Sequence, residues 1–170
     1  MNRTLTSLVL VATSVSLTGC GTRTKQNTGT PPTGYVKAAD VRLLLAAIKC
    51  DTSALDAALK DGADVNAIVE GSETPLAIMC GCSVEATQLL LDRGADPNVA
   101  NAQGLTPLLA AIILNRPDMV QLLISRGANV NAIAHVTAKT DSGTLTPLKA
   151  AKDAGRNEIV EILVKAGAKE

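Results

Sequence analysis

The fold is decided by the stretch Gly62-Ala63-Asp64-Val65-Asn66-Ala67, because the chain repeats it. Gly-Ala-Asp-Pro-Asn-Val follows at 94–99, Gly-Ala-Asn-Val-Asn-Ala at 127–132, and a shortened Gly-Ala-Lys-Glu occupies 167–170. The four leading glycines are separated by 32, 33 and 40 residues. Repetition at a period of about 20–50 residues is typical of solenoids, in which each copy is one supersecondary unit stacked on the next.

A second motif, Thr-Pro-Leu, alternates with the glycine motif at 74–76, 106–108 and 146–148, and Val41-Arg42-Leu43 takes its register in the first copy. A threonine hydroxyl can cap a helix start. Proline suits the first helical position, because an N–H there would have no acceptor within the helix. Each Thr-Pro-Leu therefore predicts the beginning of a helix.

A second helix is predicted between each Thr-Pro-Leu and the glycine that follows it. Apolar residues cluster there at 84–91, 119–124 and 159–164. Apolar faces this broad cannot be buried within one helical hairpin, so neighbouring hairpins must stack. The glycine after each segment supplies the left-handed turn that ends the helix.

Together the two motifs resemble the ankyrin repeat, with its Thr-Pro-Leu-His-x-Ala start and Gly-Ala-Asp-Val-Asn-Ala end, over residues 39–170. The resemblance implies an all-α solenoid of about four helix-turn-helix repeats joined by hairpin fingers. One departure concerns the family's histidine after Thr-Pro-Leu, which is Ala77, Leu109 or Lys149 here. Its hydrogen bond to the turn is therefore absent.

The first 20 residues combine a short basic start, an apolar centre and small residues ahead of a cysteine. This is the layout of a signal peptide, and the apolar part is shorter than the roughly 20 residues that span a bilayer. Leu17-Thr18-Gly19-Cys20 resembles the lipobox of bacterial lipoproteins, which implies cleavage before Cys20 and lipidation of that residue. The alternative is an ordinary secretory signal with a chance cysteine.

The lipobox resemblance implies a location in the bacterial cell envelope. Gly21, in place of aspartate, favours anchoring in the inner leaflet of the outer membrane, facing the periplasm. Residues 1–19 are then the signal peptide. Residues 20–38, poor in apolar side chains and interrupted by Pro31-Pro32, are a lipidated flexible tether.

Composition excludes several functions. The 170 residues include 16 Lys and Arg, 16 Asp and Glu, and one aromatic residue, Tyr35, so the chain lacks the positive field and stacking platforms of nucleic-acid binders. The only histidine, His135, has no acidic partner at motif spacing, and with Cys80 and Cys82 it makes a weak zinc pattern. We predict no enzyme activity, no metal, no cofactor and no small-molecule substrate.

The cysteines raise the question of a disulfide, because envelope proteins meet oxidising conditions. Cys50 and Cys82 each lie twelve residues before a repeat glycine, so they occupy the same turn of adjacent repeats. Stacked equivalents are about 10 Å apart, whereas a disulfide needs Cα atoms within about 6.8 Å. The second repeat is one residue shorter between its motifs than the third, which would draw this turn inward. A bridge from Cys50 to Cys80 or Cys82 is one expectation, and three buried reduced thiols are the other.

The strongest functional signal is an irregular finger. Asn131 to Asp141 spans ten residues where Asn98 to Asn101 spans three, so seven residues are inserted, within 133–140. The alternatives are that the long loop binds a partner, or that it folds down and covers nearby apolar residues.

Ankyrin repeats bind partners on the concave surface formed by fingers and first helices, and apolar residues at these positions predict a protein-binding patch. The predicted contact residues are Ile48, Leu105, Ile113, Leu114, Ile133, His135, Val136 and Leu145. We expect a monomer when unbound, acting as an inhibitor such as an immunity protein against a toxin. The alternative is a scaffold or stabiliser of a resident periplasmic protein, for instance in oxidative stress defence.

Overall fold

The computed structural model describes residues 37–69, 73–101, 103–135 and 144–169. The chain divides after Thr33, and the described residues all belong to the second unit, Gly34–Glu170. The signal peptide, Cys20, most of the tether, Val136 and most of the inserted loop lie outside the described residues. The described helices are α1 Ala38–Ile48, α2 Thr52–Lys60, α3 Pro75–Met79, α4 Val84–Asp92, α5 Pro107–Ile113, α6 Pro117–Ser125, α7 Pro147–Asp153 and α8 Asn157–Lys165.

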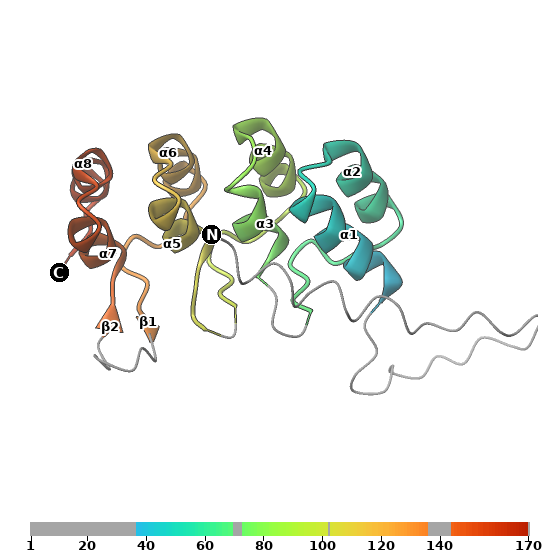
Figure 1. Cartoon of the computed structure of the whole chain (residues 1–170), viewed down its shortest axis with the longest axis horizontal. Coiled ribbons are helices and arrows are strands. Elements are labelled where there is room, and N and C mark those ends of the chain that lie inside the picture. Colours follow the sequence, from blue (N-terminus) through green and yellow to red (C-terminus); the bar gives the residue numbers. More distant parts are fainter. Residues whose placement is uncertain (1–36, 70–72, 102, 136–143, 170) are drawn as a thin grey trace, which may run out of the picture. The chain divides into compact units, whose positions relative to one another are not determined.

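The helices form four consecutive pairs, each of which is one repeat: α1 with α2, α3 with α4, α5 with α6, and α7 with α8 (Figure 1). The first helices, α1, α3, α5 and α7, pack against one another in chain order, and so do α4, α6 and α8. The predicted all-α ankyrin solenoid is confirmed.

A two-stranded hairpin stands at the base of the long finger (Figure 1). Strand β1, Ala134–His135, pairs antiparallel with β2, Thr144–Leu145, so that Ala134 faces Leu145 and His135 faces Thr144. Residues 136–143, between these strands, are not described, and they include most of the insertion predicted within 133–140. The long finger thus leaves the third repeat through β1 and enters the fourth repeat through β2.

Helix starts follow the threonine prediction. The hydroxyls of Thr74, Thr106 and Thr146 each accept a hydrogen bond from the backbone N–H three residues later, at 3.2, 3.3 and 3.2 Å. A proline takes the first helical position after each of them. The caps satisfy N–H groups that the helix itself cannot, which is why this motif begins α3, α5 and α7.

The repeat glycines end the second helices. Gly94 and Gly127 have φ angles of +89° and +88°, a left-handed conformation that is costly for residues with a Cβ. In both turns the residue after the glycine donates a backbone hydrogen bond into the helix, from Ala95 to Leu90 and from Ala128 to Leu123. The motif therefore turns the chain from helix into finger.

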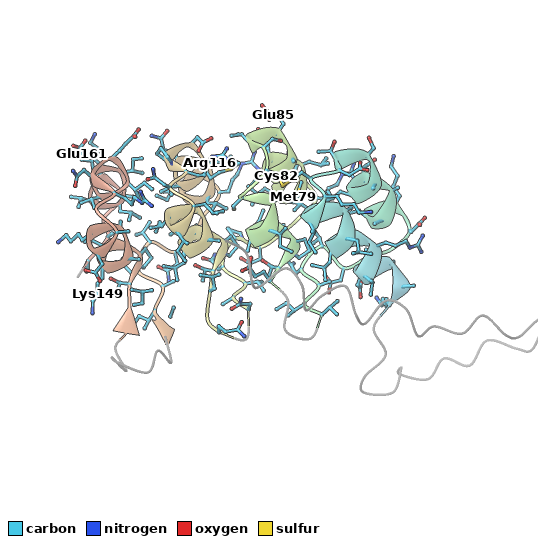
Figure 2. The ribbon with its side chains drawn as sticks, in the orientation of Figure 1. Met79, Cys82, Glu85, Arg116, Lys149 and Glu161 are labelled. Atoms are coloured by element: carbon cyan, nitrogen blue, oxygen red, sulfur yellow. A yellow bond between two sulfur atoms is a disulfide. The ribbon has the colours of Figure 1, made fainter. Side chains whose placement is uncertain are left out.

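The core runs continuously through all four repeats. Leu90, Leu123 and Leu163, each four residues before a repeat glycine, are fully buried between neighbouring hairpins. Met79 is buried as well, whereas Lys149 and Glu161 lie at the periphery (Figure 2). Broad apolar helix faces are thus buried by stacking, as the sequence predicts.

Candidate protein-binding surface

Three predicted contact residues lie exposed where the first helices end. Ile113 and Leu114, at the end of α5, are 57% and 49% exposed, and Ile48, at the end of α1, is 38% exposed. The rest of α5 is buried, so these exposed residues are not part of its packed face. We call Ile48, Ile113 and Leu114 the helix-end patch.

The finger residues among the predicted contacts differ in exposure. Ile133 is 58% exposed. Leu105 and Leu145 are half-buried and pack against the core, so they offer a partner less surface than the sequence suggests. His135 lies in β1, and its side chain is outside the described part of the structure.

The predicted contacts separate into two groups along the first helices. Leu105 directly precedes the N-cap Thr106 of α5, whereas Leu114 is its C-cap. Seven helical residues rise about 10 Å at 1.5 Å each, so the finger residues and the helix-end patch occupy opposite ends of the same layer. A partner that touches both must cover the length of a first helix.

Two further apolar residues are exposed on α1 that we did not predict. Val41 and Leu45 are 36% and 42% exposed, and with Ile48 they follow the spacing of one helix face. The buried residues of α1 are Leu43, Leu44, Ala46 and Ala47, which lie on its other side. The helical spacing of positions 41, 45 and 48 is the signal that would have identified this stripe.

The structure has a disulfide between Cys50 and Cys82, with Cα atoms 5.7 Å apart. Cys80 is a buried free thiol whose sulfur faces the backbone carbonyl of Pro107 in the third repeat, at 3.8 Å. Burial raises the pKa of the Cys80 thiol to about 12. The sequence left open whether Cys50 pairs with Cys80 or with Cys82. The structure pairs it with Cys82, because the Cys80 sulfur is directed toward the third repeat and not toward the first.

An irregular turn brings Cys82 near Cys50. Helix α3 has five residues where α5 has seven, and three residues separate Met79 from the next N-cap where the third repeat has two. The second repeat is therefore shorter in its first helix, by two residues, and longer in its turn, by one. The longer turn lets Cys82 approach the first repeat more closely than stacked equivalents do.

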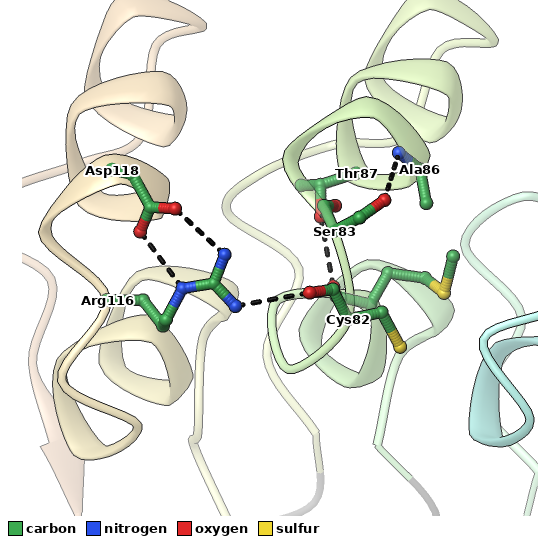
Figure 3. A network of polar contacts seen from close by, with 7 residues as sticks. Cys82, Ser83, Ala86, Thr87, Arg116 and Asp118 are labelled. Carbon is green, nitrogen blue, oxygen red and sulfur yellow. Dashed lines mark hydrogen bonds and ion pairs between the residues drawn. The ribbon is translucent and has the colours of Figure 1, made fainter.

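Arg116 holds the same turn from the other side (Figure 3). Its guanidinium donates to the carbonyl oxygen of Cys82 at 3.2 Å and makes two hydrogen bonds to the Asp118 carboxylate, at 3.0 and 2.8 Å. These interactions hold the pKa of Asp118 below its ordinary value, chiefly through the Arg116 hydrogen bond. No sequence pattern predicts this contact, because Arg116 bonds a backbone carbonyl 34 residues away.

Several of the described carboxylates form surface ion pairs. Asp56 pairs with Lys60 and Arg93, and the hydrogen bond from Lys60 is the largest cause that lowers its pKa. Arg42 pairs with Asp61, and Arg126 with Asp92. A lowered carboxyl pKa is the opposite of what a general acid near neutral pH requires.

A shallow groove of about 350 Å³ lies between α1 and α2. Alanines 46, 54, 57 and 58 and Leu45 line it, with Arg42, Lys49 and Asp61 among its charged residues. Within the described ranges, no three His, Cys, Asp or Glu side chains are grouped as metal ligands would be.

The family model for ankyrin repeats, in three copies, matches residues 43–134. The chain belongs to the ankyrin repeat family, whose members are generally protein-binding modules without catalytic activity.

Three curated proteins illustrate the similarity. The B-cell lymphoma 3 protein homolog of Mus musculus is 41% identical over 86 residues, or 49% of this chain and 19% of that protein. The putative ankyrin repeat protein FPV024 of Fowlpox virus (strain NVSL) is 38% identical over 86 residues, or 49% of this chain and 14% of that protein. The protein fem-1 homolog C of Xenopus laevis is 40% identical over 50 residues, or 29% of this chain and 8% of that protein. The chain thus spans less than a fifth of the length of these relatives.

Proposed function

We propose that this ankyrin repeat domain binds a protein through the helix-end patch and the exposed finger residue Ile133. The observation that carries the proposal is the exposure of two adjacent large apolar side chains, Ile113 and Leu114, at the end of a helix that is otherwise buried. Burying apolar surface of this kind contributes roughly 25 cal/mol per Å², which makes such patches favourable sites for a partner. Val41 and Leu45 extend the apolar surface along α1 beyond Ile48.

We further propose that the chain is anchored by a lipid on Cys20 in the inner leaflet of the outer membrane and faces the periplasm. The lipobox sequence at 17–20 supports the anchor, and a disulfide in the repeat domain suits an oxidising compartment. Among the described helices, none has the length and apolar character needed to cross a membrane. Several acyl chains anchor a protein stably where one chain does so only marginally.

The role that we propose is inhibition, such as neutralisation of a toxin that reaches the periplasm. A membrane-tethered binding surface can occlude the active site of an incoming enzyme without chemistry of its own. The competing role is that of a scaffold for a resident periplasmic protein, and the captured partner distinguishes the two.

The test is capture of binding partners by the full chain in intact envelopes. The variant Ile113→Asp with Leu114→Lys should lose the partner while its thermal unfolding stays nearly unchanged, because both side chains are exposed. Val164→Asp is the matched control, since Val164 is a similarly exposed apolar residue on α8. Purified partner and purified chain should then reproduce the patch-dependent binding.

The outcomes separate the proposals. A secreted or injected hydrolase that is lost with the patch variant, and whose activity falls as the ankyrin protein is titrated in, supports inhibition. A resident periplasmic protein supports the scaffold. Capture that does not depend on the patch would refute binding through Ile113 and Leu114. Release of a Cys20→Ala variant from the membrane, with folding intact, would support the lipid anchor.

A further inference from the structure

The first repeat is attached to the second differently from the way the later repeats are attached. Among the described helices, the contact between α2 and α4 is weaker than the contacts of α4 with α6 and of α6 with α8. At this junction α1 packs on α3, Asp56 of α2 forms an ion pair with Arg93 at the end of α4, and the Cys50–Cys82 disulfide links the two turns. Within the described part of the chain the second repeat is the only repeat that contacts the first, so each of these links contributes directly to its attachment.

The residues of the disulfide lie at the surface. Cys50 is exposed and Cys82 is half-buried, and we therefore expect a small dithiol to reach the bond from the side of Cys50. Cys80 does not compete for either sulfur, because it is buried against Pro107 and its raised pKa keeps it a thiol, whereas the thiolate is the attacking species.

The disulfide also lies beside the helix-end patch. Ile48 is two residues before Cys50. On the other side of the bond, a Cβ on Gly81 would lie 3.6 Å from Leu114 Cδ1, and the Cys82 carbonyl accepts the hydrogen bond from Arg116. Figure 3 shows the carbonyl and the sulfur of Cys82 directed to opposite sides of the turn. The turn at 80–82 thus connects the first repeat to the part of the third repeat that carries Ile113 and Leu114.

We propose that the Cys50–Cys82 disulfide is a thiol-reducible clamp that fixes the first repeat on the second. By doing so it keeps Ile48 at a fixed position relative to Ile113 and Leu114. Its effect on partner binding rests on the proposed function, whereas its effect on the first repeat does not.

The chemistry is thiol–disulfide exchange with a dithiol reductant. One thiolate of the reductant attacks the Cys50 sulfur, and the S–S bond breaks with its electron pair going to Cys82, which takes up a proton. The second thiol of the reductant then attacks the mixed disulfide. Cys50 leaves as a thiol and the reductant as its disulfide, so two electrons and two protons pass to the protein.

The experiment is hydrogen–deuterium exchange of the full chain, purified from envelopes in detergent, before and after treatment with dithiothreitol. Amides in α1 and α2 should exchange at least about tenfold faster after reduction, and those in α5–α8 should change less than about twofold. The Cys50→Ser with Cys82→Ser variant, measured without dithiothreitol, should match the reduced wild-type protein. The Cys80→Ala variant is the control, and it should behave as the wild type does in both states.

Two results would overturn the clamp: a disulfide that dithiothreitol leaves intact in the folded protein, or unchanged exchange in α1 and α2 once the bond is broken.

The affinity for the captured partner should also fall at least about tenfold on reduction, because the first repeat, which carries Ile48, is then less firmly attached. Unchanged affinity would overturn the link to the patch. If instead Ile113→Asp with Leu114→Lys binds normally, the proposed function fails, and the exchange measurement still decides whether the clamp exists.

Discussion

The side-chain oxygen of Asn98 accepts a hydrogen bond from the backbone N–H of Asn129, 2.7 Å away in the next repeat. The amide nitrogen of Asn98 also donates to the carbonyl of Gly127, at 3.1 Å, so one side chain holds both sides of the neighbouring glycine turn. Asn66 and Asn131 repeat the first contact by accepting from the backbone N–H groups of the residues at 96 and 169, at 2.9 and 2.7 Å. The asparagine of the glycine motif therefore ties each repeat to the next.

Replacing Asn98 with alanine should lower the free energy of unfolding by about 1–2 kcal/mol, because two exposed hydrogen bonds of about 1 kcal/mol each are lost. Equilibrium unfolding in urea measures the change. Asn98→Asp keeps the acceptor and loses the donor, so its loss should be smaller. An alanine variant with the wild-type midpoint would show that these bonds do not stabilise the stack.

Leu123→Ala should destabilise the domain by about 2–5 kcal/mol, since this side chain is fully buried between repeats and its removal leaves a cavity. Val164→Ala is the matched control in α8, where 55% exposure predicts a change within about 0.5 kcal/mol. Thermal and urea unfolding report both variants. Equal effects of the two substitutions would contradict the assignment of core and surface.

Removing the disulfide by Cys50→Ser with Cys82→Ser should lower the free energy of unfolding by roughly 2–4 kcal/mol in oxidising buffer, the range for closing a loop of this length. In buffer that contains a strong dithiol, the wild type and the variant should unfold at nearly the same urea concentration. A variant as stable as the wild type in oxidising buffer would show that the Cys50–Cys82 bond does not stabilise the domain.

The Arg116–Asp118 pair should contribute to stability at neutral pH and not in acid. The pKa of Asp118 is lower in the folded state than in the unfolded chain, so its contribution is full above the ordinary value of about 3.9 and is lost as pH falls through the lowered pKa. The difference in urea midpoint between wild type and Asp118→Asn should therefore shrink between about pH 5 and pH 2. A difference that stays constant over this range would contradict the pairing.

Much of the architecture follows from local sequence. Thr106 and Pro107 define a helix start through a hydroxyl cap and a missing N–H, and Gly127 defines a helix end through its left-handed backbone. These effects act within a few residues, so they can be read without knowing what lies across the fold. The apolar residues at 119–124 then require a stacking neighbour, which fixes the solenoid.

The binding surface was predicted less completely, because exposure depends on neighbouring repeats. Ile113 and Leu114 are exposed as predicted from their positions, whereas Leu105 and Leu145 are half-buried against the core. Val41 and Leu45 were not among the predicted contact residues, and both are exposed on α1. Residues of the same type, such as Leu114 and Leu105, can therefore differ in exposure.

By itself the sequence determined the repeat, its helix boundaries and the glycine turns, because each rests on interactions between residues a few positions apart. Only the tertiary structure decided that Cys82 rather than Cys80 meets Cys50, that Arg116 bonds the Cys82 carbonyl, and that Asn98 reaches the next finger. These pairs are separated by about one repeat in sequence and meet only when neighbouring repeats stack. The two contacts of Cys82 also depend on how the five-residue α3 places the turn that follows it, which no local pattern specifies.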